Sequence, residues 1–400
     1  LKISGLKIEH QKFYWGLLMK MHFMINRYSI TIYTPQEYNH SSYIQTGLFE
    51  LEKQGILDID IKLSLQHRKG KYRIENDSLI KTNEYSPKTS FYKLLDRVAK
   101  TETMFACDLY DLDNHFSSYA LENCDYVFKR NYVQEKIDQL PERYRNKVLQ
   151  LGLTFGVHSE SHKGLIKFLI ANYIGAVCWN LKWDKRILKR VFNSLQKAHN
   201  HWSHIKTSRK ISLFDSITKS ISSEQTILFQ TRCFNSNTDP DVLAIHEQRY
   251  DIIKLLKKEF PILFKGGFVA SKMSELNYTD AITNIPSDPV SYLNAVKKSS
   301  IVIYTRGLKN SPAWKMAEYC SQGKVIIAER LTAELTDALI DGKQVLFFDD
   351  YKELVKKINL VLKTKTLRDT LSLNAREFYM NTIHPKQNML RILKIMRCDL

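Results

Sequence analysis

Short apolar runs alternate with amphipathic stretches along most of the chain. Residues 29–34 (SITIYT) and 58–65 (DIDIKLSL) switch between apolar and polar side chains, which is typical of β-strands. Between them, residues 43–54 have helical spacing and are followed by Gly55, a residue that commonly ends helices. The order strand, helix, strand predicts a parallel α/β unit.

The same patterns predict the elements of the rest of the chain. In the first half we expect a loop or excursion at 66–88, a helix at 91–100, and strands at 104–110 and 126–128. In the second half we expect strands at 225–231, 262–264, 301–304, 325–328 and 345–348, helices at 249–259, 290–298, 331–340, 351–362, 367–379 and 385–396, and a tight loop at Gly266 and Gly267. Helices between buried strands predict a second parallel sheet.

The clearest of these units lies at residues 299–329. Its first strand, 301–304, is apolar and β-branched, and a polar loop follows it. Ser311 and Pro312 then predict a helix start, with Ser311 as the N-cap, and Gly323 predicts its end before the next strand. Ligands of parallel sheets bind where the carboxyl ends of strands meet the N-termini of helices.

Polar residues of the kind that bind phosphate cluster at this edge. They are Arg306, Lys309, Ser311 and Lys315, and we expect them to hold a phosphate or diphosphate. Glu318 lies two turns into the helix, where its carboxylate could accept hydrogen bonds from a ribose diol. The alternative is a surface helix with ordinary solvated charges.

Acidic residues and a histidine follow a strand of the first half, in the sequence DLYDLDNHF. Asp111, Asp113 and His115 are expected at the cleft side of the first domain. A carboxylate or imidazole there could act as the general base for an acceptor hydroxyl. The alternative role for an aspartate in front of a helix is to cap it.

Composition narrows the class of the protein. The 400 residues suit two domains, and 44% apolar with 26% charged residues is a globular balance. The net charge of +18 favours polyanions, nucleotide phosphates or an anionic membrane surface. No zinc-finger, RRM or KH signature accompanies the charge, so nucleic acid is not the expected partner.

A stretch between the two halves combines apolar and basic character. Residues 165–181 form the longest apolar run, but polar side chains within it make it unsuited to span a membrane. Residues 182–210 hold nine Lys or Arg and one acid, Asp184, with apolar and basic residues on opposite faces of the predicted helix. Such a helix binds an anionic membrane surface, or else packs on its own domain with its basic face solvated.

Metal and redox signals are weak. The cluster of His199, His201 and His204 lacks cysteine or acidic partners, so no metal is expected. The six cysteines have no metal-binding spacing and are expected to be reduced. Early charges at Lys2 and Lys7 do not fit a signal peptide, and together these observations predict a cytoplasmic protein.

Residues 299–329 resemble the donor-site segment of the group-1 glycosyltransferases, which have the GT-B fold. That segment has two Glu separated by seven residues, followed by a small residue, x, Gly, x, Pro, Val and Ile. Glu318 falls on the second Glu and Gly323 on the glycine. Asn310 stands at the first Glu and Val325 at the Pro, so the retaining mechanism associated with the paired Glu is not implied.

The resemblance extends to other parts of the chain. Residues 148–156 (VLQLGLTFG) resemble the last strand of the first domain and its glycine turn, and Arg232 stands where the family often contacts the donor diphosphate. The implied fold class is α/β with two Rossmann-like domains facing across a cleft. The implied units are 1–222, with a helical insertion at about 158–222, then 223–380, and a closing helix within 381–400 that crosses back to the first domain.

The implied activity is transfer of a sugar from a nucleotide-diphosphate sugar to a hydroxyl acceptor. A glycan or lipid-linked glycan of a surface polysaccharide is the expected acceptor, reached from the cytoplasm with docking on the inner face of the membrane. Such enzymes need no cofactor and no bound metal. Two alternatives stay open: a sugar-nucleotide epimerase of the same architecture, and a non-enzymatic basic protein that binds nucleic acid or a membrane surface.

Overall fold

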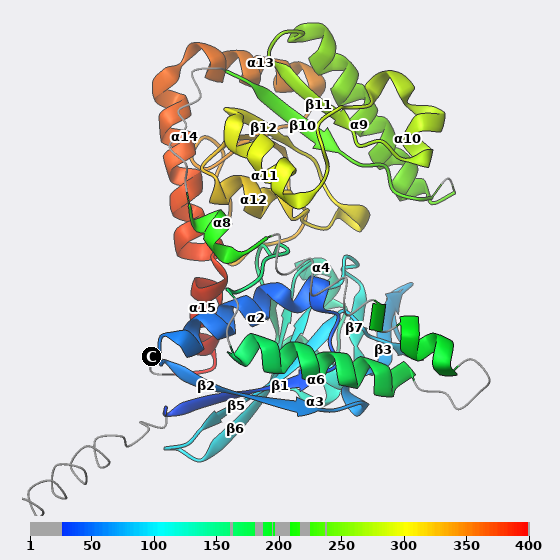
Figure 1. The fold of residues 1–400 in the computed structure, drawn as a ribbon, viewed down its shortest axis with the longest axis vertical. Coiled ribbons are helices and arrows are strands. Elements are labelled where there is room, and N and C mark those ends of the chain that lie inside the picture. The colour runs from blue at the N-terminus through cyan, green and yellow to red at the C-terminus, as the bar shows by residue number, and fades with distance from the viewer. Residues whose placement is uncertain are drawn as a thin grey trace, which may run out of the picture.

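The computed structural model describes residues 26–160, 163–180, 187–193, 195–196, 209–216, 225–236 and 238–398. Two α/β domains lie one above the other (Figure 1). Along one side, α14 (Lys365–Phe378) covers the second domain and α15 (Pro385–Ile395) reaches the first (Figure 1). The expectation of two Rossmann-like α/β domains facing each other across a cleft is confirmed.

The first domain is built on a six-stranded sheet with the order β2-β1-β5-β6-β8-β9. Its strands are β1 (Tyr28–Thr34), β2 (Leu57–Leu63), β5 (Thr89–Asp96), β6 (Thr101–Asp108), β8 (Tyr126–Lys129) and β9 (Val148–Gln150). All neighbours are parallel except β5, which runs antiparallel to both β1 and β6. Its helices are α2 (Tyr38–Lys53), α3 (Ser118–Asn123), α4 (Gln134–Asp138), α5 (Glu142–Arg145) and α6 (Lys163–Asn180).

Two predictions for this domain are wrong. The helix expected at 91–100 is largely the strand β5, because a central strand that is buried on both faces loses the polar alternation that marks a strand. The loop expected at 66–88 instead holds the short helix η1 (Gln66–Arg68) and two strands. These are β3 (Lys69–Glu75) and β4 (Ser78–Tyr85), which form a small antiparallel sheet with β7 (His115–Ser117).

The second domain has a five-stranded, fully parallel sheet with the order β11-β10-β12-β13-β14. Its strands are β10 (Ile227–Thr231), β11 (Phe264–Phe268), β12 (Ile301–Tyr304), β13 (Val325–Glu329) and β14 (Leu346–Phe348). Its helices are α9 (Pro240–Glu259), α10 (Lys272–Asn277), α11 (Pro289–Lys298), α12 (Lys315–Ser321) and α13 (Tyr351–Lys363), with short turns η2 (Thr279–Ala281) and η3 (Leu308–Asn310). Asp350 caps α13 through its side chain.

Three predictions for the second domain are also wrong. Gly266 and Gly267 lie inside β11 rather than in a loop, because the strand passes so close to neighbouring backbone that a Cβ would not fit. Residues 331–340 form turns and bends instead of a helix. The helix expected from Ser311 begins at Lys315, because the backbone of Ser311 bonds to Gly307 and Leu308 and closes a loop.

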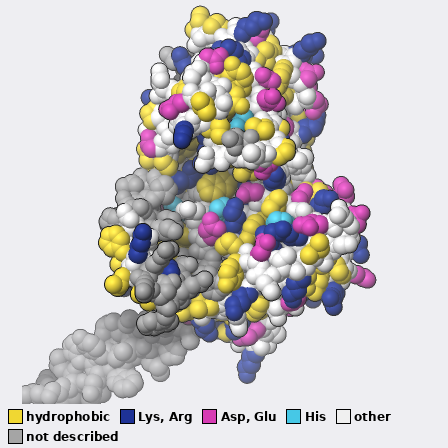
Figure 2. All heavy atoms as spheres, turned by 90° about the vertical axis from the view of Figure 1, so that its right-hand side faces the viewer, with side chains coloured by type: hydrophobic (Ala, Val, Ile, Leu, Met, Phe, Trp, Pro, Cys, Tyr) yellow, Lys and Arg dark blue, Asp and Glu magenta, His cyan; other side chains and the backbone are white. Residues whose placement is uncertain are grey.

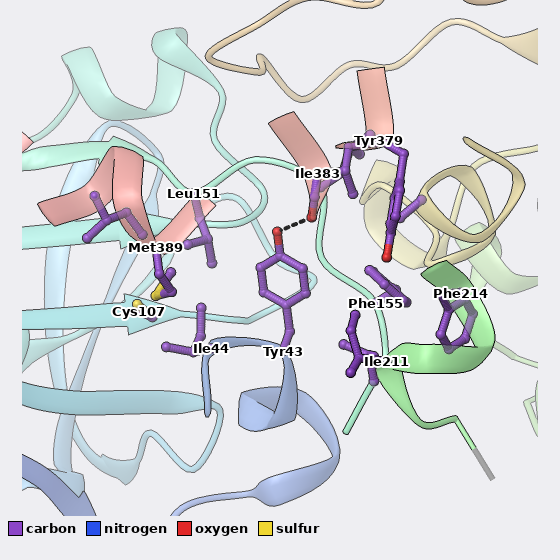
Figure 3. Close-up of a cluster of buried hydrophobic side chains, with 14 of the residues drawn as sticks. Tyr43, Ile44, Cys107, Leu151, Phe155, Ile211, Phe214, Tyr379, Ile383 and Met389 are labelled. Atoms are coloured by element: carbon purple, nitrogen blue, oxygen red, sulfur yellow. Dashed lines mark hydrogen bonds between the residues drawn. The ribbon is translucent and has the colours of Figure 1, made fainter. Parts of the chain in front are cut away.

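One apolar core joins the two domains. It includes α8 (Ile211–Asp215) and the π-helical turn η4 (Tyr379–Ile383), which lies between α14 and α15. Figure 3 shows Phe155 between Tyr43 of α2 and Phe214 of α8, with the Tyr43 hydroxyl pointing to the Ile383 carbonyl. The hydroxyl donates to that oxygen at 2.6 Å. The crossing between the domains is therefore packed and hydrogen-bonded.

The closing helix lies against the first domain. Asn388 of α15 donates to the Leu151 carbonyl at 2.9 Å, and Arg391 donates to the same oxygen at 3.1 Å. Gly47 of α2 faces Met389 and Pro385 so closely that a Cβ would collide with them. A glycine in α2 thus permits close contact between the two helices.

The region between the domains is described only in part. α6 packs on β1 and β2, where Gly175 meets Pro35 and Leu63. Residues 187–193 and 195–196 are helical, whereas His199, His201, His204 and Asp184 lie outside the described residues. In the described part, no helix combines the length and apolar character needed to cross a bilayer.

Candidate functional site

A cavity of about 820 Å³ opens between the two domains. Its first-domain wall includes Asn39, His40, Asp111 and His158, and its second-domain wall comes from the ends of β10 and β12 and from α12. Figure 2 shows the hollow between the two lobes. The volume lies within the usual range for small-molecule sites, and its walls combine aromatic with charged side chains.

Three cations line the second-domain wall. Arg232 follows β10, Lys315 opens α12, and Arg249 lies on the buried side of α9. Arg249 donates to the carbonyls of Arg232 at 2.9 Å and Arg306 at 3.1 Å, and so ties two strand-end loops together. Within the described part of the chain, no carboxylate lies within ion-pair distance of Arg232, Arg249 or Lys315.

The three cations affect one another's pKa values. Burial and the positive charges of Arg249 and Arg232 together lower the pKa of Lys315 to about 7, against the opposing effect of Glu318. Burial also lowers the pKa of Arg249 to about 10, with Arg232 adding to the effect. A bound anion would relieve this repulsion, so the wall is suited to a diphosphate.

Glu318 lines the same wall but already has a partner. Its carboxylate pairs with Arg209, which comes from the segment between the domains. Arg209 also donates to the Gly156 carbonyl, and its guanidinium lies 5.7 Å from the Trp314 ring. The Glu318 carboxylate is therefore held in a fixed position by a chain of contacts that crosses the cleft.

Asp111 lies on the opposite wall, between two cations. Its carboxylate is 2.7 Å from Arg130 and 2.8 Å from Lys88, and it accepts a hydrogen bond from the Ser311 hydroxyl at 3.3 Å. Burial alone would raise the pKa of Asp111, but Arg130 and Lys88 outweigh it and lower the pKa to about 2. Asp111 is therefore a stable anion and a weak base.

Two of the expected phosphate ligands lie elsewhere. Arg306 pairs with Asp241 at 2.6 Å, and the Lys309 ammonium is 3.0 Å from Asp239. Both acids belong to the start of α9, and neither basic residue lines the cavity. Arg306 and Lys309 thus fasten the loop after β12 to α9.

Two of the expected catalytic residues are also outside the cavity lining. Asp113 lies in the loop before β7, and His115 lies in β7, where burial and nearby cations lower its pKa to about 4. The predicted residues that the structure brings together around the cavity are Asp111, Arg232, Ser311, Lys315 and Glu318.

Position 310, where the resemblance places a Glu, is an exposed loop position. Asn310 has a φ of +58° there, a conformation that Asn adopts more readily than Glu. It is not among the residues that line the cavity. The backbone conformation at position 310 therefore favours the Asn found here over the Glu of the family pattern.

Comparison with known proteins adds an observation on the second domain. Residues 267–394 match a family model described as glycosyl transferase-like. The match runs from β11 to α15 and includes Glu318, Gly323 and the strand that carried the resemblance, so the resemblance is confirmed for this part of the chain. No curated protein matches the sequence.

Several solved structures align with this chain at low sequence identity. The C-terminal domain of the group-1 glycosyl transferase LpcC from Francisella tularensis is 12% identical, covering 43% of this chain and 97% of that one, with a TM-score of 0.30. TarM is 12% identical with a TM-score of 0.34, and the comparison covers 79% of this chain but only 65% of TarM. HepE from Anabaena, in complex with UDP-glucose, is 12% identical with a TM-score of 0.32, and the comparison covers 68% of this chain and 79% of HepE.

Four residues that line the cavity were not found from sequence. Arg249 begins a predicted helix and Arg130 follows a predicted strand, with no motif around either, and His40 lies in the first turn of α2. Arg209 belongs to the basic stretch, whose charge was assigned to solvent or membrane. Of the four, only Arg209 stood out in the sequence, because it is the last arginine before the second domain.

Proposed function

We propose that this protein transfers a sugar from a nucleotide-diphosphate sugar to a hydroxyl group of an acceptor. The observation that carries the proposal is the wall of Arg232, Arg249 and Lys315, three cations without carboxylate partners among the described residues. In sugar transfer the diphosphate is the leaving group, and negative charge accumulates on it as the bond to the sugar breaks. Fixed cations at that position lower the barrier.

The remaining groups of the second-domain wall position the donor. Glu318, held by Arg209, would accept hydrogen bonds from the ribose hydroxyls. Ser311 would contribute a hydroxyl at the meeting point of the two domains. Because three cations can offset the charge of the leaving diphosphate, the proposal requires neither a metal ion nor a cofactor.

The acceptor would enter from the first-domain wall. Asp111 is a weak base because Arg130 and Lys88 hold its charge, so its expected role is to orient the groups around it. His40 also lines the cavity, and its Nδ1 is 3.3 Å from the Glu37 carboxylate. Glu37 would stabilise the imidazolium that forms when His40 accepts the proton of the acceptor hydroxyl.

The expected acceptor is a glycan or a lipid-linked glycan used in a surface polysaccharide, and the expected place of reaction is the cytoplasmic side of a membrane. The stretch of basic and apolar residues between the domains supports this acceptor class. The proposed catalysis in the cleft does not depend on this stretch.

Thermal-shift measurements with UDP, GDP, ADP and CMP sugars test donor binding, and one of the diphosphate sugars should raise the melting temperature. Product analysis with that donor should show a sugar moved to an added glycan or lipid-linked acceptor. Stabilisation by none of these sugars would overturn the proposal, and an epimerised donor without transfer would support the epimerase instead.

A variant tests the acceptor side separately. His40→Gln should leave the donor-induced shift unchanged and slow transfer by about 100-fold, the usual contribution of a general base. Asn39→Ala, one residue away on the same wall, is the control for local disturbance. Equal rates for His40→Gln and the unmodified protein would remove His40 from the mechanism.

A further inference from the structure

Two helical stretches between the domains, α6 and residues 187–193 with 195–196, have a distinct composition. Neither 163–180 nor 187–196 contains an acidic residue. We define the insert face as the exposed lysines and large apolar residues of these stretches, which are Lys163, Lys167, Ile170, Ile174, Leu188, Lys189, Phe192 and Leu195. The insert face is therefore positively charged as well as apolar.

Large apolar side chains on this face are unusually exposed. Leu188, Phe192 and Leu195 are 81%, 65% and 51% exposed, and their spacing of four and three residues places them on one side of a helix. Ile170 and Ile174 of α6, also one turn apart, are 54% and 50% exposed. Contiguous apolar exposure of this kind marks an interaction surface.

The opposite side of α6 explains why this stripe faces outward. Leu165 and Phe168 are buried, and Gly175 packs on the ends of β1 and β2. The exposed positions 163, 167, 170 and 174 follow the helical repeat on the other side. α6 therefore presents a basic first half and an apolar second half away from its own sheet.

We infer that the insert face docks the protein on an anionic lipid bilayer. Charge complementarity selects this occupant: the face has no acidic side chain, and residues 182–210 hold nine basic residues against one acid. Lysines attract the anionic headgroups, while the leucines and Phe192 enter the boundary between headgroups and acyl chains. The inference rests on the proposed function only in that a lipid-linked acceptor explains why docking would be useful.

Vesicle sedimentation of the full chain, without nucleotide, tests the inference. We expect binding to vesicles of equal parts phosphatidylcholine and phosphatidylglycerol, weaker binding at high salt, and little binding to phosphatidylcholine alone. The double variant Leu188→Ser and Phe192→Ser should bind the anionic vesicles at least about tenfold more weakly, because each buried apolar side chain contributes more than one factor of ten. Leu276→Ser, an exposed apolar position on α10, should bind normally.

Each other outcome has a clear meaning. Protein that stays in the supernatant with anionic vesicles at low salt overturns the inference. Dimers in the absence of vesicles, lost in the double variant while vesicle binding is unaffected, would assign the face to a second copy of the chain and also overturn it. Nucleotide-sugar thermal shifts on the same variants report on the cleft, so failure of docking and failure of the proposed function are separable.

Discussion

Glu318 and Arg209 form an ion pair between the donor wall and the segment that joins the domains. Arg209 lies outside the range that matches the family model, whereas Glu318 lies within it. Arg209 has a φ of +62°, so the backbone is held in an uncommon conformation at the residue that reaches Glu318. The position of the Glu318 carboxylate is therefore set partly by a residue that lies outside the matched range.

Replacing Glu318 should separate ribose binding from diphosphate binding. Glu318→Gln removes a charge that would accept ribose hydrogen bonds, and we expect binding of the nucleoside diphosphate to weaken by about 1.5–3 kcal/mol. Binding of inorganic diphosphate, which has no ribose, should change little. Isothermal titration calorimetry with both ligands measures the difference.

Arg232→Met is the matched control, because it removes a cation from the same wall and should weaken the binding of both the nucleoside diphosphate and inorganic diphosphate. Equal affinity of Glu318→Gln and the unmodified protein for the nucleoside diphosphate would remove the ribose role. A loss of inorganic diphosphate binding in Glu318→Gln would show that its effect is on the structure of the wall.

Lys315 predicts a pH dependence of binding. Its pKa is lowered to about 7, and a bound diphosphate would raise it, so binding near neutral pH takes up a proton. Affinity should therefore fall as the pH rises above about 7 and level off below it. Calorimetry in buffers of different ionisation enthalpy measures the uptake, which should be absent in Lys315→Met. Uptake of the same size in that variant would assign the proton to another group.

At the scale of elements, the short motifs were easier to predict than the sheet around them. Alternation predicted β1 and β2, and Gly323 predicted the end of α12, because each depends on local sequence. β5 was missed because it lies between β1 and β6 in the middle of the sheet. Most of its side chains are buried, so its sequence does not alternate between apolar and polar residues as a half-exposed strand does. The start of α12 was misplaced because long-range and loop hydrogen bonds, including one from Ala313 to the Tyr304 hydroxyl, override the local cap signal.

The helix crossing predicts a measurable loss of stability. Tyr43→Phe removes the hydroxyl that donates to the Ile383 carbonyl and accepts from Asn388 at 3.1 Å, leaving both groups buried without it. We expect the free energy of unfolding to fall by about 1–3 kcal/mol in urea titrations. Tyr126→Phe is the control, since no bond of its hydroxyl is described. Equal stability of the two variants would contradict a structural role for the Tyr43 bond.

For the whole molecule, the site depends on how the domains meet. Arg130 of the first domain donates to the Pro312 carbonyl of the second, and Asn131 donates to the Lys309 carbonyl at 3.3 Å. Glu334 accepts from the Gln134 amide at 2.9 Å and donates its own amide to the Tyr132 carbonyl at 2.8 Å. Sequence could identify residues at strand ends, such as Arg232 and Lys315, but not that Arg306 would be drawn away by Asp241, since that pairing depends on the packing of α9.

The order in which the chain is made gives the packing of α15 a further consequence. α2 leaves the ribosome long before α15, yet the surface around Gly47 and Tyr43 is covered by Pro385, Met389 and their neighbours. Until α15 has been synthesised, the first domain carries an uncovered apolar face that chaperones can bind. A transcript cut short before α15 would therefore yield an aggregation-prone product rather than a smaller working domain.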